Sequence, residues 1–379
     1  MNPLKVAHVL QGLGRGGAEQ LVIDLVRARP KGPVRYSVVS LYREASSARI
    51  KGLEDAGVPF FHTNKASHPD PAALFALIRV LHQVHPDIVH THTFSGLVYG
   101  HAAAVACGIP KIVHTDHASG NLGAVYGKLQ WLTEFLERHE SAVITFSDSL
   151  KSRLVASRRL RPERVHVIPN GVPIRPLAGE NERARIRKQF GINADEIFVL
   201  SVGGLRPEKN YQLLLRAIAK IQREAPELSL RTWIVGEGTE REGLMKSIGS
   251  LSLSATSLAG ERDDISELMQ ACDVYVNTSA WEGMPIAVLE AMAAGRAVVA
   301  PRIGMMPELL SAAGVLVDAD ELSVASAIIR LGTDFSRRSQ LGSLARALVV
   351  EKFSIDRAAE LHEALYFGLL SRLRAGSTN

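Results

Sequence analysis

The chain has 379 residues, 46% of them hydrophobic, which is enough to bury a large core and suggests two or three domains. Its two cysteines, Cys107 and Cys272, form neither a CxxC motif nor a disulfide framework, which argues against a disulfide-stabilised secreted domain and favours a reducing compartment. The formal net charge is +5, and the positive excess lies in the first half: residues 1–175 hold 21 Lys and Arg against 13 Asp and Glu, leaving 23 against 26 for the rest.

The first segment, MNPLKVAHVL, runs directly into a strand-like pattern without a cleavable signal. No apolar run in the sequence approaches the roughly 18 to 20 residues that a transmembrane helix needs. We therefore expect a cytoplasmic protein.

Short apolar runs alternate with helix-like stretches along the whole chain. Continuous Val and Ile, rather than strict alternation with polar residues, is typical of parallel strands buried on both faces. The runs are KVAHVL, YSVVSL, DIVHTH, KIVHTD, AVITFS and VHVIP, then IFVLSVG, RTWIVGEG, VYVNTS, AVVAP and GVLVD. Because the βα order occurs in two sets, the sequence predicts an α/β protein of two doubly wound domains that face each other across a cleft.

A glycine-rich loop follows the first strand. Gly12, Gly14 and Gly17 spell GxGxxG at the start of a helix, which is the dinucleotide fingerprint in its proper strand-to-helix context. The ribose-binding acid expected about 20 positions on is displaced, since Glu44 lies 27 positions after Gly17. This weakens the dehydrogenase hypothesis, and the alternative is that the glycines let backbone amides approach a phosphate or a sugar.

Part of the positive excess lies in KSRLVASRRLRPER, residues 151–164. This segment either faces anionic lipid headgroups or an acidic acceptor, or is simply a solvated helix face and loop. Farther on, PNGVPIRPLAGENERAR, from Pro169, is rich in Pro, Gly and charge and is typical of an interdomain linker.

The predicted domain boundaries follow from this linker. We expect a first domain over residues 1–172 and a second over 173–354. Helical patterns run from Ser323 to about Glu351 and from Ile355 to about Arg374, with no strand after them. The final segment, 355–379, is expected to be a helix that packs back on the first domain.

A strand, loop, helix and strand near the end of the chain carry two acids eight positions apart, Glu282 and Glu290. The strand VYVNTS leads into Glu282 and Gly283, Pro285 is expected in the first helical turn, and Gly295 ends the helix before AVVA. At this edge of a parallel sheet ligands bind, and helix amides attract anions. The alternative is that Glu282 is a helix cap and Glu290 a solvated helix residue.

Twelve of the 13 histidines precede residue 170, which raises the question of a metal site. His90 and His92 are expected to point to opposite faces of the strand DIVHTH, so no shared metal is predicted. Asp318 and Asp320 form a DxD pattern after GVLV, where we expect a surface turn. No metal and no cofactor are therefore predicted.

Nine segments, in order, resemble the large family 4 of retaining GT-B glycosyltransferases over nearly the whole chain. They are GRGGAEQ, HTHTFSG, VHTDHASG, ITFSDSL, VIPNGV, SVGGLRPEKN, IVGEG, LAGERDDISELMQACDVYVNTS and EGMPIAVLEAMAAGRAVV. The resemblance implies the GT-B fold. It also implies transfer of a sugar from a nucleotide donor, held mainly by the C-terminal domain, to an acceptor held mainly by the N-terminal domain.

The resemblance also assigns roles to residues at the donor. It implies that Glu282 bonds hydroxyls of the donor sugar, that Glu290 bonds the ribose diol and that Lys209 neutralises the diphosphate leaving group. His117 matches the active-site histidine beside the donor sugar, although it could instead be a capping or core histidine. The remaining matched positions are Gly16 and Gly17 in the first loop, Gly283, Met284, Ile286 and Ala287 at the sugar and diphosphate, and Arg262 at the nucleotide base.

One position departs from the family pattern. The family usually has Arg where this chain has Gly204, so one positive charge is missing from the loop. Arg206, two residues later, is expected to reach the diphosphate instead, because a guanidinium binds phosphate in bidentate fashion. The competing hypothesis is weaker donor binding or a different donor. Asp116 adjoins His117, but the family's same-face reaction gives it no role as a general base.

The leading hypothesis is thus a metal-independent retaining glycosyltransferase that acts in polysaccharide or glycolipid biosynthesis. We expect a nucleotide-diphosphate sugar as donor, a lipid-linked or saccharide acceptor, no nucleic acid, and contact with anionic membrane at the inner face. The alternatives are a GT-B sugar-nucleotide epimerase and a noncatalytic sugar-nucleotide-binding partner.

Overall fold

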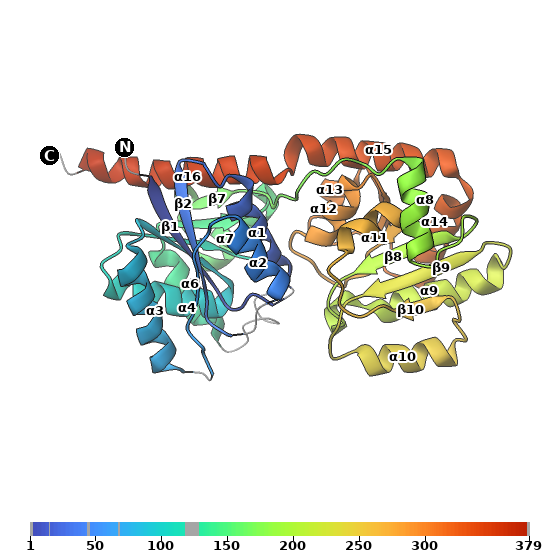
Figure 1. The fold of residues 1–379 in the computed structure, drawn as a ribbon, viewed down its shortest axis with the longest axis horizontal. Coiled ribbons are helices and arrows are strands. Elements are labelled where there is room, and N and C mark those ends of the chain that lie inside the picture. The colour runs from blue at the N-terminus through green and yellow to red at the C-terminus, as the bar shows by residue number, and fades with distance from the viewer. Residues whose placement is uncertain (1–2, 15, 44–45, 67–68, 118–128, 377–379) are drawn as a thin grey trace. The chain divides into compact units, whose positions relative to one another are not determined.

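The computed structural model describes residues 3–14, 16–43, 46–66, 69–117 and 129–376, with side chains to residue 371 (Figure 1). Contacts divide the chain into two compact units. Unit 1 consists of Met1–Gly171 and Ile355–Asn379, and unit 2 is Val172–Ser354. Each unit is built on one parallel sheet with helices between the strands, so the predicted α/β class is confirmed.

The sheet of unit 1 has seven strands in the order β3-β2-β1-β4-β5-β6-β7. Their bounds are β1 (Leu4–Leu10), β2 (Val34–Ser40), β3 (Phe60–His62), β4 (Ile88–His92), β5 (Lys111–Thr115), β6 (Ala142–Thr145) and β7 (Val165–Val167). The sequence predicted all of these except β3. This edge strand, FFH, contains no Val or Ile run of the kind that marked the other strands.

Helices cover both faces of this sheet. They are α1 (Gly17–Ala28), α2 (Ser47–Asp55), α3 (Pro71–Val84), α4 (Thr93–Ala106), α6 (Gln130–His139), α7 (Asp148–Arg158) and α16 (Ile355–Gly376). One face packs on α1, α2 and α16 through side chains such as Val22, Leu53 and Tyr366. The other face packs on α3 and α4, which contribute Leu77 and Tyr99. The two ends of the chain therefore share one core, in which α16 lies against α1 (Figure 1).

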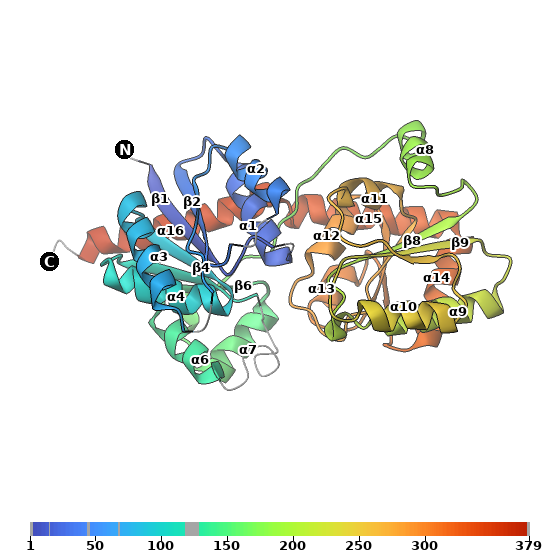
Figure 2. The same ribbon diagram turned by 60° about the horizontal axis from the view of Figure 1, so that its bottom comes forward.

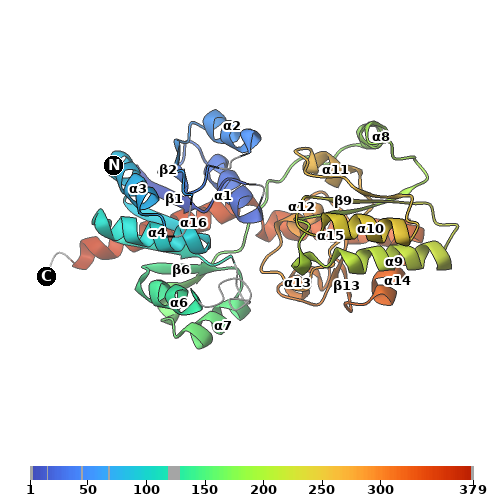
Figure 3. The ribbon, with the colours of Figure 1, turned by 90° about the horizontal axis from the view of Figure 1, so that it is seen from below.

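The sheet of unit 2 has six strands in the order β10-β9-β8-β11-β12-β13. The strands are β8 (Ile197–Val202), β9 (Leu230–Val235), β10 (Thr256–Leu258), β11 (Val274–Val276), β12 (Ala297–Pro301) and β13 (Val315–Val317). The helices are α8 (Glu180–Gln189), α9 (Tyr211–Glu224), α10 (Arg241–Ser250), α11 (Ile265–Ala271), α12 (Ile286–Ala293), α13 (Met306–Leu310), α14 (Glu321–Thr333) and α15 (Phe335–Lys352). On one face α9 packs against α10 and α14 (Figure 3).

Two expectations about helices in unit 2 are wrong. The charged end of the predicted linker, ENERAR, is the first part of α8, because Arg183 and Arg187 are held by a buried acid. The single helical pattern from Ser323 to about Glu351 is two helices. It breaks at Asp334, whose side chain accepts the backbone N–H of Arg337 and so caps α15.

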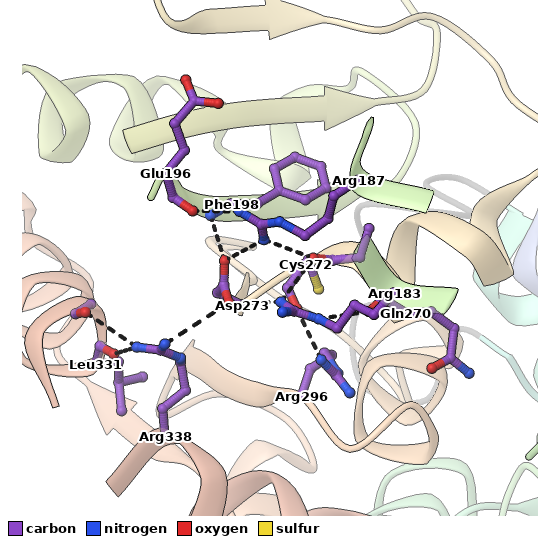
Figure 4. Close-up of polar contacts among 12 residues, drawn as sticks. Arg183, Arg187, Glu196, Phe198, Gln270, Cys272, Asp273, Arg296, Leu331 and Arg338 are labelled. Carbon is purple, nitrogen blue, oxygen red and sulfur yellow. Dashed lines mark hydrogen bonds and ion pairs between the residues drawn. The ribbon is translucent and has the colours of Figure 1, made fainter. Parts of the chain in front are cut away.

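The buried acid that holds α8 is Asp273, immediately before β11 (Figure 4). Its carboxylate accepts hydrogen bonds from Arg183 Nη2 at 2.7 Å and Arg187 Nη1 at 2.8 Å. The backbone N–H of Phe198 donates to it at 2.8 Å. Burial alone would raise the pKa of Asp273, but these partners, Arg183 foremost, hold it below its ordinary value. This network joins α8 to the centre of the second sheet.

None of the described helices has both the length and the apolar character required to cross a membrane.

Candidate active site

The side chains of Lys209 and Glu282 meet at the carboxyl end of the second sheet. Lys209 ends a 3-10 turn, Pro207–Lys209, that follows β8, and Glu282 lies between β11 and α12. Lys209 Nζ donates to Glu282 Oε1 at 2.5 Å, and both side chains are partly exposed. The structure thus brings together two residues that lie 73 positions apart in the sequence. This is the edge where parallel sheets bind ligands.

Two further polar residues hold Glu282, and the sequence analysis missed both. Ser279 Oγ donates to Glu282 Oε1 at 2.7 Å, and Asn277 Nδ2 lies 3.5 Å from the same oxygen. Thr278 Oγ1 donates to the backbone carbonyl of Lys209 at 3.1 Å. The available signal was the polar run Asn277, Thr278, Ser279 directly after a buried strand. Lys209, Ser279 and Asn277 all contact Oε1 of Glu282, and none of these three contacts involves Oε2.

Gly304 supports the backbone of Glu282 from the neighbouring loop. Its φ is +48°, in the left-handed region, and a Cβ there would collide with the carbonyl oxygen of Glu282. Position 304, in the loop after β12, therefore requires a glycine where it approaches the backbone of Glu282.

The loop after β8 contains Gly204, where the sequence departs from the family pattern. Arg206 lies beside it: a Cβ on Gly204 would be 3.2 Å from Arg206 Nε. The Arg206 side chain is mostly exposed and pairs with Glu208 at 3.0 Å. The Arg206 guanidinium thus lies next to the position from which the family's arginine would extend.

The helix α12 carries Glu290 in its second turn, and Gly295 ends it, as the sequence predicted, with φ +68°. Pro285 is the residue before the helix, with ψ 113°, and does not belong to the first turn as expected. Of the other positions matched to the donor, Gly283 and Met284 are buried, while Ile286 and Ala287 are half-buried at the first turn of α12. Glu290 itself is half-buried.

Arg262 lies in the loop between β10 and α11. Its guanidinium binds both carboxylate oxygens of Asp264, at 2.7 and 2.5 Å. It also lies over the rings of Phe190 and Trp233, 5.3 and 5.6 Å from their centroids. No pattern in the sequence marked this aromatic pair.

The candidate residues of unit 1 lie at the carboxyl end of its own sheet. His117 follows β5 and is half-buried; its Nε2 lies 3.0 Å from His92 Nδ1. Gly16 precedes α1 in an extended conformation, and Gly17 is the first helical residue. The next three residues of the histidine motif, 118–120, and Glu44 lie outside the described residues.

Asp116 has a structural contact that fits its exclusion as a base. Its carboxylate is 1% exposed and pairs with Arg158 Nη2 at 2.7 Å. Arg158 is equally buried and also pairs with Glu137 Oε1 at 2.5 Å. Burial raises the pKa of Glu137 to about 8, against the effect of Arg158. Arg158 is therefore an internal cation and not part of a solvated basic face.

The expectation for His90 and His92 is wrong. Side chains two positions apart on a strand share a face, so both point to the face covered by α16. The rings stack with centroids 4.2 Å apart, and His8 of β1, which pairs with His90, joins them. Ring nitrogens of His8, His90 and His92 lie within 4.8 Å of one another.

Comparisons with known proteins bear on both units. The model of Glycosyl transferases group 1 matches residues 182–347, and that of Glycosyltransferase Family 4 matches residues 15–175. An uncharacterized glycosyltransferase of Methanocaldococcus jannaschii is 30% identical over 292 residues, covering 72% of this chain and 73% of the relative. The UDP-Gal:alpha-D-GlcNAc-diphosphoundecaprenol alpha-1,3-galactosyltransferase of Escherichia coli is 27% identical over 323 residues, 83% of each chain.

Solved structures share the fold. Anabaena HepE, in complex with UDP and glucose, superposes with a TM-score of 0.82 at 24% identity, covering 96% of this chain and 99% of that one. This likeness confirms the predicted GT-B fold.

Proposed function

The chain belongs to the family 4 glycosyltransferases of the GT-B fold, and we propose that it is a retaining, metal-independent enzyme that extends a lipid-linked saccharide. The observation that carries this proposal is the contact of Lys209 with Glu282, held by Ser279, at the carboxyl end of the second sheet. A cation and a fixed acceptor side by side suit a ligand with a diphosphate and hydroxyl groups.

In the proposed reaction the bond from the anomeric carbon to the diphosphate breaks, and charge grows on the departing oxygen. The acceptor hydroxyl bonds to the same face of that carbon and gives its proton to the departing phosphate oxygen. In this step the Lys209 ammonium leaves its contact with Glu282 and pairs with the departing phosphate oxygen. The positive charge of Lys209 therefore acts most strongly in the transition state. Glu282 then binds hydroxyls of the sugar, and Glu290 binds the ribose diol. The Lys209 ammonium supplies the charge that a divalent ion supplies at a metal-dependent site.

The amides at the start of α12, together with Gly283 and Met284, are proposed to line the sugar and diphosphate. The Arg262 loop is proposed to hold the base. In unit 1, His117 and the loop of Gly16 and Gly17 are proposed as substrate-binding residues. Retention rests on the family likeness, and the E. coli relative is named for forming an α-1,3 bond to a diphosphoundecaprenol-linked sugar. That name motivates the lipid-linked acceptor.

The test is a donor panel that begins with UDP-hexoses, followed by transfer to diphosphoundecaprenol-linked sugars with and without EDTA. We expect one donor to raise the melting temperature, and proton NMR to show a product with the anomeric configuration of the donor at an unchanged rate in EDTA. An inverted product would contradict retention. A changed donor without acceptor would favour an epimerase, and binding without turnover would favour a noncatalytic partner.

We expect Arg206→Ala to lower kcat about tenfold or more, because one charge-assisted hydrogen bond to the diphosphate is lost. Adding Gly204→Arg to that variant should recover part of the rate by restoring the family's arginine beside the same phosphate. Arg216→Ala is the matched control, since that arginine is also exposed in unit 2 and pairs with an acid, Glu321, at 3.1 Å. A wild-type rate for Arg206→Ala would show that Arg206 does not replace the missing arginine.

The neighbouring helices α6 and α7 are proposed to meet an anionic membrane at the cytoplasmic face (Figure 2). Trp131 and Phe135 lie one turn apart on α6 and are 65% and 52% exposed. Arg159 and Arg161, just after α7, are exposed as well. Exposed aromatic rings beside cations suit the interface of an anionic bilayer.

We expect Trp131→Ser with Phe135→Ser to weaken binding to vesicles containing phosphatidylglycerol by about tenfold or more, because two aromatic side chains no longer enter the interface. Flotation of the protein with the vesicles measures this binding. Phe75→Ser is the control, since that ring is 66% exposed on α3. Equal flotation of all three proteins would contradict the proposed surface.

A further inference from the structure

Three histidines of unit 1 form a hydrogen-bonded chain that ends at the candidate site. His8 Nδ1 lies 2.9 Å from His92 Nε2, and His92 Nδ1 lies 3.0 Å from His117 Nε2. His8 and His92 are buried, whereas His117 is half-buried after β5. A linear connection thus runs from the core beneath α16 to a residue proposed to contact the donor.

The geometry of this group suits hydrogen bonds better than a shared metal ion. His90 and His92 stack with an interplanar angle of 29°, whereas an imidazole binds a metal in the plane of its ring. Both nitrogens of His90 are already engaged, Nδ1 with Tyr366 Oη at 2.7 Å and Nε2 with Thr115 Oγ1 at 2.8 Å. A metal would have to break these bonds and turn the rings.

The hydrogen-bonded series His8–His92–His117 can hold its protons in two arrangements. Burial lowers the pKa of His8 and of His117 to about 3 and the pKa of His92 well below its ordinary value, so all three are neutral near pH 7. A neutral imidazole has one N–H and one bare nitrogen. The N–H groups therefore point either outward, with His8 donating to His92 and His92 to His117, or inward, with His117 donating to His92 and His92 to His8.

His8, at the inner end of this histidine series, decides between the two proton arrangements. His8 Nε2 is buried and has no hydrogen-bond partner among the described residues. Donation inward would leave an N–H at this nitrogen, whereas donation outward leaves a bare lone pair. Orphaned buried N–H groups are rarer than under-satisfied acceptors, so outward donation is favoured. His117 Nε2 then accepts from His92, and the proton of His117 is on Nδ1.

We propose that His8 and His92 are positioning residues that hold His117 as its Nδ1–H tautomer, so that it presents a hydrogen-bond donor to the substrate. This inference deepens the proposed function. With Nε2 occupied and Nδ1 protonated, His117 cannot take the proton of an acceptor hydroxyl. Its N–H suits a sugar or phosphate oxygen that gains charge in the transition state.

The tautomer is read directly by NMR of the full chain labelled with 15N-histidine, with the His117 signals assigned by comparison with His117→Gln. We expect a protonated Nδ1 and a bare Nε2 at pH 7, without any donor present. An Nε2–H tautomer in the wild-type protein would overturn the proposal. So would one equivalent of bound zinc, found by elemental analysis, that shifts the signals of His8, His90 and His92.

Variants of His92 test the positioning role. His92→Asn keeps an amide donor where Nδ1 was and should keep the His117 tautomer, whereas His92→Leu should release it and lower kcat about tenfold with little change in donor KM. Tyr366→Phe is the control, because it removes the partner of His90 and leaves the His8–His92–His117 chain intact. An unchanged tautomer in a folded His92→Leu variant would contradict the role of His92.

The tautomer of His117 and the transfer activity are measured independently. The tautomer is measured without substrate, so the predicted Nδ1–H form can be found even in a protein that transfers no sugar. Conversely, sugar transfer with His117 in the Nε2–H form would support the proposed function and contradict the positioning role of His8 and His92.

Discussion

Replacing Lys209 with alanine is expected to lower kcat by a factor of about 10² to 10³, the range found when one group that stabilises transition-state charge is removed. The Lys209 side chain is partly exposed, and its Nζ lies 2.5 Å from Glu282 Oε1 at the carboxyl end of the second sheet. Because the diphosphate gains charge as the sugar leaves, the loss should fall on kcat more than on donor KM.

The fold should survive this change. Glu282 keeps the hydrogen bond from Ser279 and is partly exposed, so its carboxylate is not left buried without a partner. Lys246→Ala removes an exposed lysine of α10 in the same unit and should leave both the rate and the melting temperature unchanged. Initial rates of nucleotide release for the three proteins decide the matter, and a kcat for Lys209→Ala within threefold of wild type would remove Lys209 from the mechanism.

Asp273→Ala is expected to destabilise unit 2 by about 3 to 5 kcal/mol, because it leaves the buried guanidinium of Arg187 and the partly exposed one of Arg183 without their carboxylate. Arg183 and Arg187 both bind this acid, and the backbone of Phe198 donates to it in the centre of the sheet (Figure 4). Without the acid, α8 loses the two ion pairs that tie it to the start of β11 and keeps its hydrogen bonds to backbone carbonyls and its packing on α11. Hydrogen exchange measured by mass spectrometry should show faster exchange in α8, β8 and β11.

The same acid predicts a pH dependence. Since the folded state holds the pKa of Asp273 below its ordinary value of 3.8, its contribution to stability is present above about pH 4 and is lost as the pH falls through the folded pKa. The free energy of unfolding of Asp273→Asn should therefore fall less steeply below pH 4 than that of the wild type. Asp318→Asn, an exposed acid in the same unit, is the control and should follow the wild type. Parallel wild-type and Asp273→Asn curves would contradict the assignment.

The sequence predicted the elements with long apolar runs and failed where three-dimensional contacts decide. The strands β3 (FFH) and β10 (TSL) lack the Val and Ile runs that marked the other strands, including the equally short edge strands β7 and β13. The helix α8 has a charged sequence that resembles a linker. It is ordered by Asp273, which lies far away in the sequence and could not be paired with it in advance.

The candidate site shows the same division. Glu282 and Glu290 were singled out by the strand, loop and helix around them, Lys209 was identified by resemblance, and the resemblance assigned the roles of all three. The support from Ser279 and Gly304 depends on how neighbouring loops approach, which no local pattern records. The histidines were misjudged for a different reason. The period of two along a strand places His90 and His92 on one face, and the opposite expectation misapplied it.

The position of α16 in the core of unit 1 has a consequence for synthesis of the chain on the ribosome. Tyr366 of that helix is fully buried and bonds His90 of β4, so the unit that begins at β1 lacks part of its core until residues beyond 355 have emerged. Unit 2 is contiguous and is translated whole before α16 appears. A nascent chain therefore carries a finished second unit while the first still exposes apolar surface to chaperones, and a premature stop codon before α16 should yield a product marked for degradation.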